Sequence, residues 1–380
     1  MKKKLIAAIL TIAMLAVMAA GCSGGADKNA KDSGGADKDT FKIGVVFYSK
    51  DDALGQSVVS TINYAAEVLG NVEIEWNICG TEPTEQIAAV ENLISSGCKG
   101  IMTIPMTDVV SQRSAEACEA AGVKLALCFR NISDDSIREQ VESMDCYVGQ
   151  CEEDEKGTAK EVVEYLVDQG YSKFGVGYLD PSNALVARNK GTDAGIEETK
   201  SEKLAEYTIP LAQDPQTHSS AIENFMSSYP SMEAVIIDSA AQGGGEAILS
   251  TIASSGSDLK MAAFDTFDGM KDGFDQGIIE VLVGGMYPDA LFTFMALYNA
   301  VDGTPLSEEP VHLSQGYLLI RSADECEVYE TYVADPNFRI YDEDAIKSMA
   351  GRYNKDLTLD KLQGLQDEFS MDYVMEQIQK

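Results

Sequence analysis

Residues Phe41 to Gly70 constrain the fold more than any other stretch, because their pattern predicts a buried strand, a short polar loop and an amphipathic helix. Phe41 to Tyr48 is an almost continuous apolar run, which is typical of a parallel strand covered by helices on both faces. In an open α/β sheet the loop after such a strand faces the ligand crevice, so Asp51 lies at a candidate site. The predicted helix buries four apolar residues that recur at helical spacing: Val58, Ile62, Ala65 and Leu69.

The same unit of strand, loop and helix recurs along most of the chain. Four apolar strands alternate with three helices between residues 41 and 131, and a second series of strands and helices runs from 148 to 283. Parallel strands that are joined by helices form a sheet with helices on both faces and right-handed crossovers. The expected fold class is therefore α/β, with two doubly wound parallel-sheet lobes in succession.

The first 21 residues have the order of a secretory signal, with three lysines followed by an apolar run from Leu5 to Ala20. Ala19-Ala20-Gly21-Cys22 resembles the lipobox of bacterial lipoproteins, in which the cysteine sulfur carries a diacylglycerol. That pattern favours Leu where this chain has Ala19, so an ordinary cleaved signal remains the alternative. We expect lipidation at Cys22 and a protein held at the extracytoplasmic face of the cell membrane.

Residues 22–40 form a segment with almost no apolar side chains, in which Ser-Gly-Gly-Ala-Asp-Lys occurs twice. Such a composition predicts a flexible tether rather than a packed element. A coil of this length spans on the order of 24 Å, which is enough to hold a folded body clear of lipid headgroups.

Charge and motif content exclude several classes of function. The net charge of −33 gives a surface that repels nucleic acid and anionic lipid, so membrane contact is expected only through the anchor. The chain has no Gly-x-Ser-x-Gly or His-Glu-x-x-His motif, and His218 and His312 lie far apart without a partner pattern. We therefore expect no catalysis, no metal site and no cofactor. The alternative is a phosphate-binding site at the turn Gly243 to Gly245, which precedes a predicted helix.

The chain has eight cysteines, one of which is the candidate lipid site. The other seven are odd in number and have no Cys-x-x-Cys spacing, so they predict neither a disulfide framework nor a zinc motif. We expect them to be small buried residues, with a disulfide between Cys146 and Cys151 as the alternative.

Six segments stand in an order and spacing that are specific when they are taken together. They are IGVVF, IPMTD with the following SAEACEAAGVKLAL, FRN, NALVARNKGTDAGI, AAFDTFDGMKDGF and MYPDALFTFMAL. Through them, the run from Phe41 to Ser322 resembles the type I periplasmic binding proteins of the ribose and galactose class. These proteins are the substrate receptors of bacterial ABC sugar importers.

The resemblance implies two lobes joined by a hinge of three crossover strands, with the ligand trapped when the lobes close. The first lobe would hold residues 41–147 and 287–313, and the second would hold 148–286 and 314–325. Residues 326–380 would form an acidic helical extension, which we expect to be a packing appendage.

The resemblance also implies three ligand-binding residues in the cleft between the lobes. Arg130 matches the family's arginine after the fourth strand, Arg188 its arginine at the start of a second-lobe helix, and Asp265 its cleft aspartate. A guanidinium donates to two adjacent hydroxyls and a carboxylate accepts from two, which suits a polyol. Surface positions for the arginines and a helix-capping role for Asp265 are the alternatives.

Other positions depart from the family pattern, so the ligand contacts are expected to be rearranged. Phe129 stands where the ribose receptors have an aspartate, and their late glutamine falls on Met286. Their cleft asparagine falls near Asp238 or Ser239. These four residues and Asp51 complete the predicted ligand site. Two arginines without the family's aspartate leave an acidic or phosphorylated ligand as the alternative to a sugar.

The resemblance implies a monomeric receptor that captures a sugar or related small polar ligand and delivers it to an ABC permease and its ATPase. The alternative is a lipoprotein that reports the same ligand to a sensor kinase or chemoreceptor. Both functions need a surface that forms when the lobes close, so the sequence does not separate them.

Overall fold

A computed structural model describes residues 40–181, 183, 185–285 and 287–379. The predicted signal peptide, Cys22, the tether before Thr40 and the predicted site residue Met286 lie outside the described residues. Within the described part, none of the helices combines the length and the apolar character that crossing a membrane requires.

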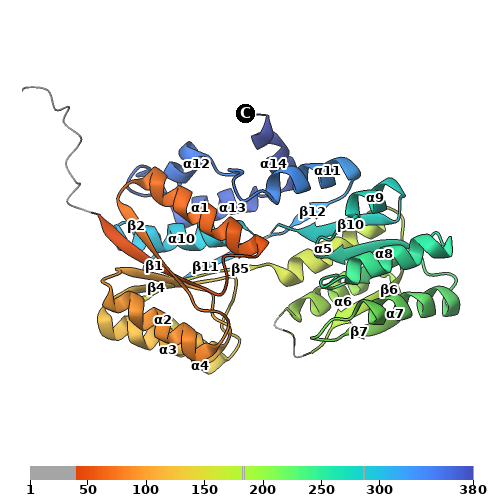
Figure 1. The fold of residues 1–380 in the computed structure, drawn as a ribbon, viewed down its shortest axis with the longest axis horizontal. Helices are drawn as coiled ribbons and strands as arrows, with labels where there is room; N and C mark the ends of the chain where they lie inside the picture. Colours follow the sequence, from red (N-terminus) through yellow and green to blue (C-terminus); the bar gives the residue numbers. More distant parts are fainter. Residues whose placement is uncertain (1–39, 182, 184, 286, 380) are drawn as a thin grey trace, which may run out of the picture. The chain divides into compact units, whose positions relative to one another are not determined.

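The first sheet has six strands in the order β11-β5-β4-β3-β1-β2, and all of its neighbouring strands are parallel (Figure 1). Its strands are β1 (Phe41–Phe47), β2 (Val72–Ile78), β3 (Gly100–Thr103), β4 (Lys124–Cys128), β5 (Tyr147–Glu153) and β11 (Val311–Gln315). The helices that accompany them are α1 (Ala53–Leu69), α2 (Pro83–Ser95), α3 (Asp108–Ala121), α4 (Asp135–Glu142) and α10 (Pro288–Val301).

The second sheet also has six strands, in the order β12-β10-β9-β8-β6-β7. β12 is antiparallel to β10, and the other pairs are parallel. Its strands are β6 (Lys173–Leu179), β7 (Glu202–Ile209), β8 (Ala234–Ile237), β9 (Lys260–Phe264), β10 (Ile279–Gly284) and β12 (Leu318–Ile320). Its helices are α5 (Glu155–Asp168), α6 (Ala187–Thr199), α7 (Pro215–Ser228), α8 (Gly244–Ser255) and α9 (Met270–Asp275).

These sheets confirm the predicted α/β class with two doubly wound lobes. The predicted first unit is present in detail, because the Asp52 side chain caps α1 by accepting from the backbone N–H of Gly55 at 2.7 Å. Gly70 ends α1 with a φ of 73°, a left-handed conformation that glycine adopts without steric cost. The four apolar residues predicted to face the core are buried: Val58, Ile62, Ala65 and Leu69.

The chain passes between the two sheets at three places. It leaves the first sheet after β5, returns after β10, and passes from β11 to β12 between Gln315 and Leu318. The lobe boundary predicted between residues 147 and 148 falls at the start of β5, and this strand stays in the first sheet as far as Glu153.

The seven cysteines in the described part are free thiols, and six of them are buried. Cys146 donates to the carbonyl of Ala115 at 3.4 Å, whereas Cys151 Sγ lies 2.9 Å from the Gln366 side-chain nitrogen. The alternative disulfide between Cys146 and Cys151 is therefore not formed in this structure.

The described part of the C-terminal extension, together with the residues just before it, contains four α-helices and one π-helical turn. They are α11 (Ala323–Val328), the turn Tyr329–Val333, α12 (Glu343–Ser348), α13 (Leu359–Asp367) and α14 (Met371–Ile378). α12 lies beside α1, as Figure 1 shows. Buried residues near Ile346 and Leu362 join the core of the first lobe, and those near Tyr329 and Met371 join the core of the second. The extension is therefore part of both hydrophobic cores.

This packing predicts that Leu362→Ala destabilises the protein, although the residue lies far beyond the last strand. Leu362 is fully buried, so truncation leaves a cavity and is expected to lower the free energy of unfolding by about 2–5 kcal/mol. Urea unfolding measures the change. Leu211→Ala is the matched control, because Leu211 is 57% exposed and its truncation should cost less than about 0.5 kcal/mol. Equal effects of the two substitutions would contradict the packing described here.

Candidate ligand-binding cleft

Three cavities open beside the carboxyl ends of the parallel strands, where open α/β sheets bind ligands. Their volumes are about 330, 260 and 210 Å³. The first two share Leu54, and the last two share Phe129, Arg130 and Glu153. Because neighbouring cavities share these residues, we treat them as one cleft, with walls from both lobes.

The first-lobe wall is built at the end of β4 by Phe129 and Arg130. Phe129 is buried and has a φ of 61°, a conformation that is strained for a bulky side chain. Its ring packs edge-on against Phe47, with the ring centroids 6.3 Å apart. Arg130 donates from Nη1 to the carbonyl of Phe129 at 2.7 Å and lies 4.0 Å from the carboxylate of Glu153. The turn therefore directs one cation and one aromatic ring into the cleft.

The second-lobe wall contains Asp265, which follows β9 and also has a left-handed φ, of 77°. One of its carboxylate oxygens accepts from the hydroxyl of Ser239 at 2.7 Å. Ser239 in turn accepts from the side-chain amide of Gln213 at 2.8 Å. This chain of hydrogen bonds orients Asp265 in the largest cavity, and Ser239 acts on the site through Asp265.

Arg188 is at the start of α6, and its side chain is only 1% exposed. It donates twice to the carboxylate of Glu155, once from Nε and once from Nη2 at 3.2 Å. It also donates to the carbonyl of Asp238 at 3.0 Å and to the hydroxyl of Tyr317 at 3.2 Å. The guanidinium lies 4.2 Å from the ring centroid of Phe264. Arg188 is thus not a surface residue, and its charge is already paired within the protein.

Two further predicted site residues, Asp238 and Asp51, lie outside the walls of these cavities. Asp238 is fully buried and accepts from Thr192 at 2.9 Å, and burial raises the pKa of its carboxyl to about 7. Asp51 is exposed, and its backbone carbonyl accepts from the Gln56 side chain. The structure therefore brings together Phe129, Arg130, Arg188 and Asp265, with Ser239 behind Asp265.

Sequence reasoning missed a group of buried carboxyls beside the crossover from β5 to α5. The Glu153 side chain is 4% exposed, and burial together with Glu155 raises its pKa to about 7. Asp289, in the first turn of α10, is fully buried, and burial together with Glu153 raises its pKa well above the ordinary value. The acidic run from Glu152 to Glu155 could have indicated this group, but the helical pattern placed the run at the start of α5.

The cleft also contains three tyrosines that sequence reasoning did not assign to it. Tyr287, Tyr317 and Tyr329 line the largest cavity with Arg188 and Asp265. Across the described residues, no three His, Cys, Asp or Glu side chains are grouped closely enough to hold a metal ion.

Comparison with known protein families agrees with this fold and this cleft. Residues 43–305 match the model of a periplasmic binding protein domain, and the chain belongs to that family. Its two six-stranded lobes are the type I periplasmic binding protein fold. No curated protein matches the chain by sequence.

Solved structures with the same fold are distant in sequence. A periplasmic ribose ABC transporter protein from Conexibacter woesei is 14% identical, with a TM-score of 0.62 over 77% of this chain and 95% of that chain. A solute-binding protein from Bacillus halodurans with bound myo-inositol is 19% identical, with a TM-score of 0.56 over 78% and 99%. The arabinose-transporter binding component from Shewanella is 14% identical, with a TM-score of 0.56 over 76% and 95%.

Glu153 predicts a measurable pH dependence of stability. Its pKa is about 7 in the folded chain and about 4.5 ordinarily, so the folded state binds more protons than the unfolded state between these values. The contribution of the Glu153 carboxyl to the free energy of unfolding is therefore fully present below about pH 4.5, and it is lost as the pH rises through 7. We expect Glu153→Gln to match wild type near pH 4.5 and to exceed its free energy of unfolding by about 1–3 kcal/mol at about pH 8.

Urea unfolding at the two pH values measures this difference. Glu139→Gln is the control, because Glu139 is exposed on α4 and its variant should follow wild type at both values. A constant difference between Glu153→Gln and wild type across this range would contradict the assignment.

Proposed function

We propose that this protein is an extracytoplasmic receptor that captures a sugar or related polyol in its cleft and delivers it to the permease and ATPase of an ABC importer. The observation that carries the proposal is a cleft in which both lobes present polar groups. Arg130 is a donor on the first-lobe wall, and Asp265 is an oriented acceptor on the second-lobe wall. Closure of the lobes would bring both groups onto one small ligand.

The lining of the cleft suits a sugar better than an apolar ligand. Thr81 and Tyr48 add hydroxyl groups to the first-lobe wall. Leu54, Ile104 and Phe129 offer apolar surface to the faces of a sugar ring. The combined volume of the three cavities, about 800 Å³, is within the range of small-molecule sites.

Charge in the cleft argues against the acidic or phosphorylated ligand. Arg188 is paired with Glu155, and Arg130 lies beside Glu153. The described residues that line the three cavities include more carboxylates than basic groups. An anionic ligand would meet this excess negative charge at close range, and the repulsion would make its binding less favourable. A neutral polyol avoids that cost.

Similar proteins support transport over sensing. The solved structures are described as ABC transporter components, with myo-inositol or arabinofuranose bound in two of them. The sensing alternative has no comparable support. Membership of a periplasmic binding protein family supports an extracytoplasmic location. Lipidation at Cys22, the tether, the lobe boundaries and a monomeric state remain parts of this proposal.

The proposal predicts that a sugar raises the melting temperature and that Asp265→Asn weakens its binding. The panel for the thermal-shift screen is D-ribose, L-arabinose, D-galactose, D-tagatose and myo-inositol, with ribose 5-phosphate and glucuronate as anionic comparisons. Loss of the charged acceptor should weaken the best sugar about 10- to 100-fold, which isothermal titration calorimetry measures. Asparagine tolerates the left-handed φ at this position, so the fold should persist.

Asp258→Asn is the matched control, because Asp258 is an exposed aspartate of the same lobe, outside the cleft walls. It should leave binding unchanged. A protein that is stabilised only by the anionic compounds, or by none of the panel, would overturn the proposed function.

A further inference from the structure

Among the described residues that line the three cleft cavities, Tyr329 comes from the C-terminal extension. The family match ends at residue 305, and Tyr329 lies beyond it. Tyr329 nevertheless lines the largest cavity, together with Asp265 and Gln242. The part of the chain beyond the matched domain, which already contributes Tyr317 to this cavity, therefore also contributes Tyr329.

Local structure positions this tyrosine closely. Tyr329 begins the π-helical turn that follows α11, and π-helical turns occur frequently at functional sites. Tyr329 is 4% exposed, and its hydroxyl lies against Gly284 at the end of β10. A Cβ at Gly284 would lie 3.1 Å from that hydroxyl and 2.9 Å from Thr266, so glycine leaves the space that the tyrosine occupies. The hydroxyl hydrogen-bonds with the side chains of Thr266 and Tyr287 and accepts from the backbone N–H of Gly285.

The extension is anchored to the first lobe as well. Arg352 forms a bidentate ion pair with Asp302, at 2.9 to 3.2 Å, just after α10. Tyr353 donates to the carbonyl of Leu69 at 2.6 Å, at the end of α1. The chain then returns to the second lobe, where Met371 is part of the hydrophobic core. Tyr329 is therefore on a segment that both lobes hold.

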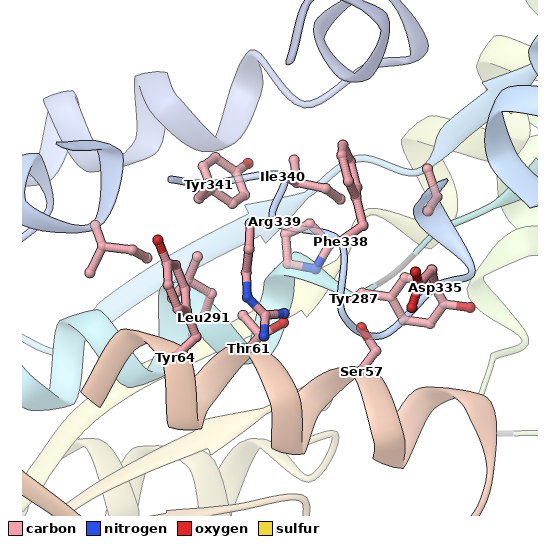
Figure 2. A pocket seen from close by; sticks show the side chains of 13 residues that line it. Ser57, Thr61, Tyr64, Tyr287, Leu291, Asp335, Phe338, Arg339, Ile340 and Tyr341 are labelled. Carbon is pink, nitrogen blue, oxygen red and sulfur yellow. The ribbon is translucent and has the colours of Figure 1, made fainter. Parts of the chain in front are cut away.

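Figure 2 shows where the extension crosses α1. Arg339 reaches from the segment 335–341 towards Thr61 and Tyr64, and its guanidinium lies 4.8 Å from the ring centroid of Tyr64. The pocket there has a volume of about 30 Å³, against about 330 Å³ for the largest cavity of the cleft. This second pocket is therefore too small for a sugar.

We propose that Tyr329 contacts the ligand directly, so that the C-terminal extension completes the binding site and helps to determine specificity. The inference rests on the proposed function, because it takes the ligand to be a sugar or polyol. The phenol ring supplies aromatic surface on the wall of the cavity that also contains Asp265. Its hydroxyl holds Thr266 and Tyr287, which line the same cavity. The ligand would therefore contact a residue of the extension as well as residues of the matched domain.

The test uses the chain from Ser23 to Lys380 and the panel sugar that gives the largest thermal shift. Tyr329→Phe removes only the hydroxyl, and we expect the dissociation constant to rise about three- to tenfold by calorimetry. Tyr329→Leu also removes the ring, and the rise should exceed tenfold. Tyr332→Phe is the matched control, because it removes a hydroxyl from the same turn at a residue outside the cavity, and it should bind as wild type does.

A second control separates contact from general destabilisation. Leu362→Ala weakens the packing of the extension away from the cavity, so its folded form should bind the sugar as wild type does. Wild-type affinity in both Tyr329 variants, with weakened binding in Asp265→Asn, would overturn this inference and leave the proposed function intact. Absence of binding to every panel sugar by the wild-type chain would overturn both.

Discussion

The buried ion pair between Arg188 and Glu155 is the contact on which the geometry of the cleft depends. Glu155 follows the crossover from β5, and Tyr317, which bonds to both partners, lies in the crossover from β11 to β12. Arg188 comes from α6 and also holds the carbonyl of Asp238 at the end of β8. One guanidinium therefore connects two of the three hinge segments to the floor of the second lobe. Loss of one partner of a buried pair typically costs about 3–5 kcal/mol, because the other charge remains buried.

This arrangement changes the role that the cleft arginines are expected to play. Arg188 matches a family position associated with ligand, but its donors are mostly used within the protein. The guanidinium of Arg188 is paired with Glu155, so it positions Tyr317 and the carbonyl of Asp238 instead of providing an unpaired charge to a ligand. Arg130 and Asp265 are both partly exposed in the cleft. Arg130 follows Phe129, which has a left-handed backbone conformation, and Asp265 has a left-handed backbone conformation itself. Strained turns of this kind persist where the surrounding structure determines them, as at binding sites.

The sequence predicted the fold well because its signals are local. Apolar strands, helical spacing and glycines after helices repeat with short periods, and both sheets follow from them. The site was predicted in part, since strand-end residues such as Arg130 and Asp265 can be placed from topology. The partners that decide their chemistry are distant: Glu155 is 33 residues from Arg188, and Tyr317 is 129 residues away. Tyr329 could not be placed from its own segment, because the close approach of Gly284 is a tertiary feature.

Small-angle X-ray scattering tests the central claim, which is that two lobes close on a small polyol held between them. The measurement compares the chain from Ser23 to Lys380 alone and saturated with the panel sugar that stabilises it most. Hinge closure moves two rigid lobes together, so the account predicts that the radius of gyration falls on saturation and returns when the sugar is removed. An identical scattering profile with and without a sugar that calorimetry shows to be bound would contradict the account.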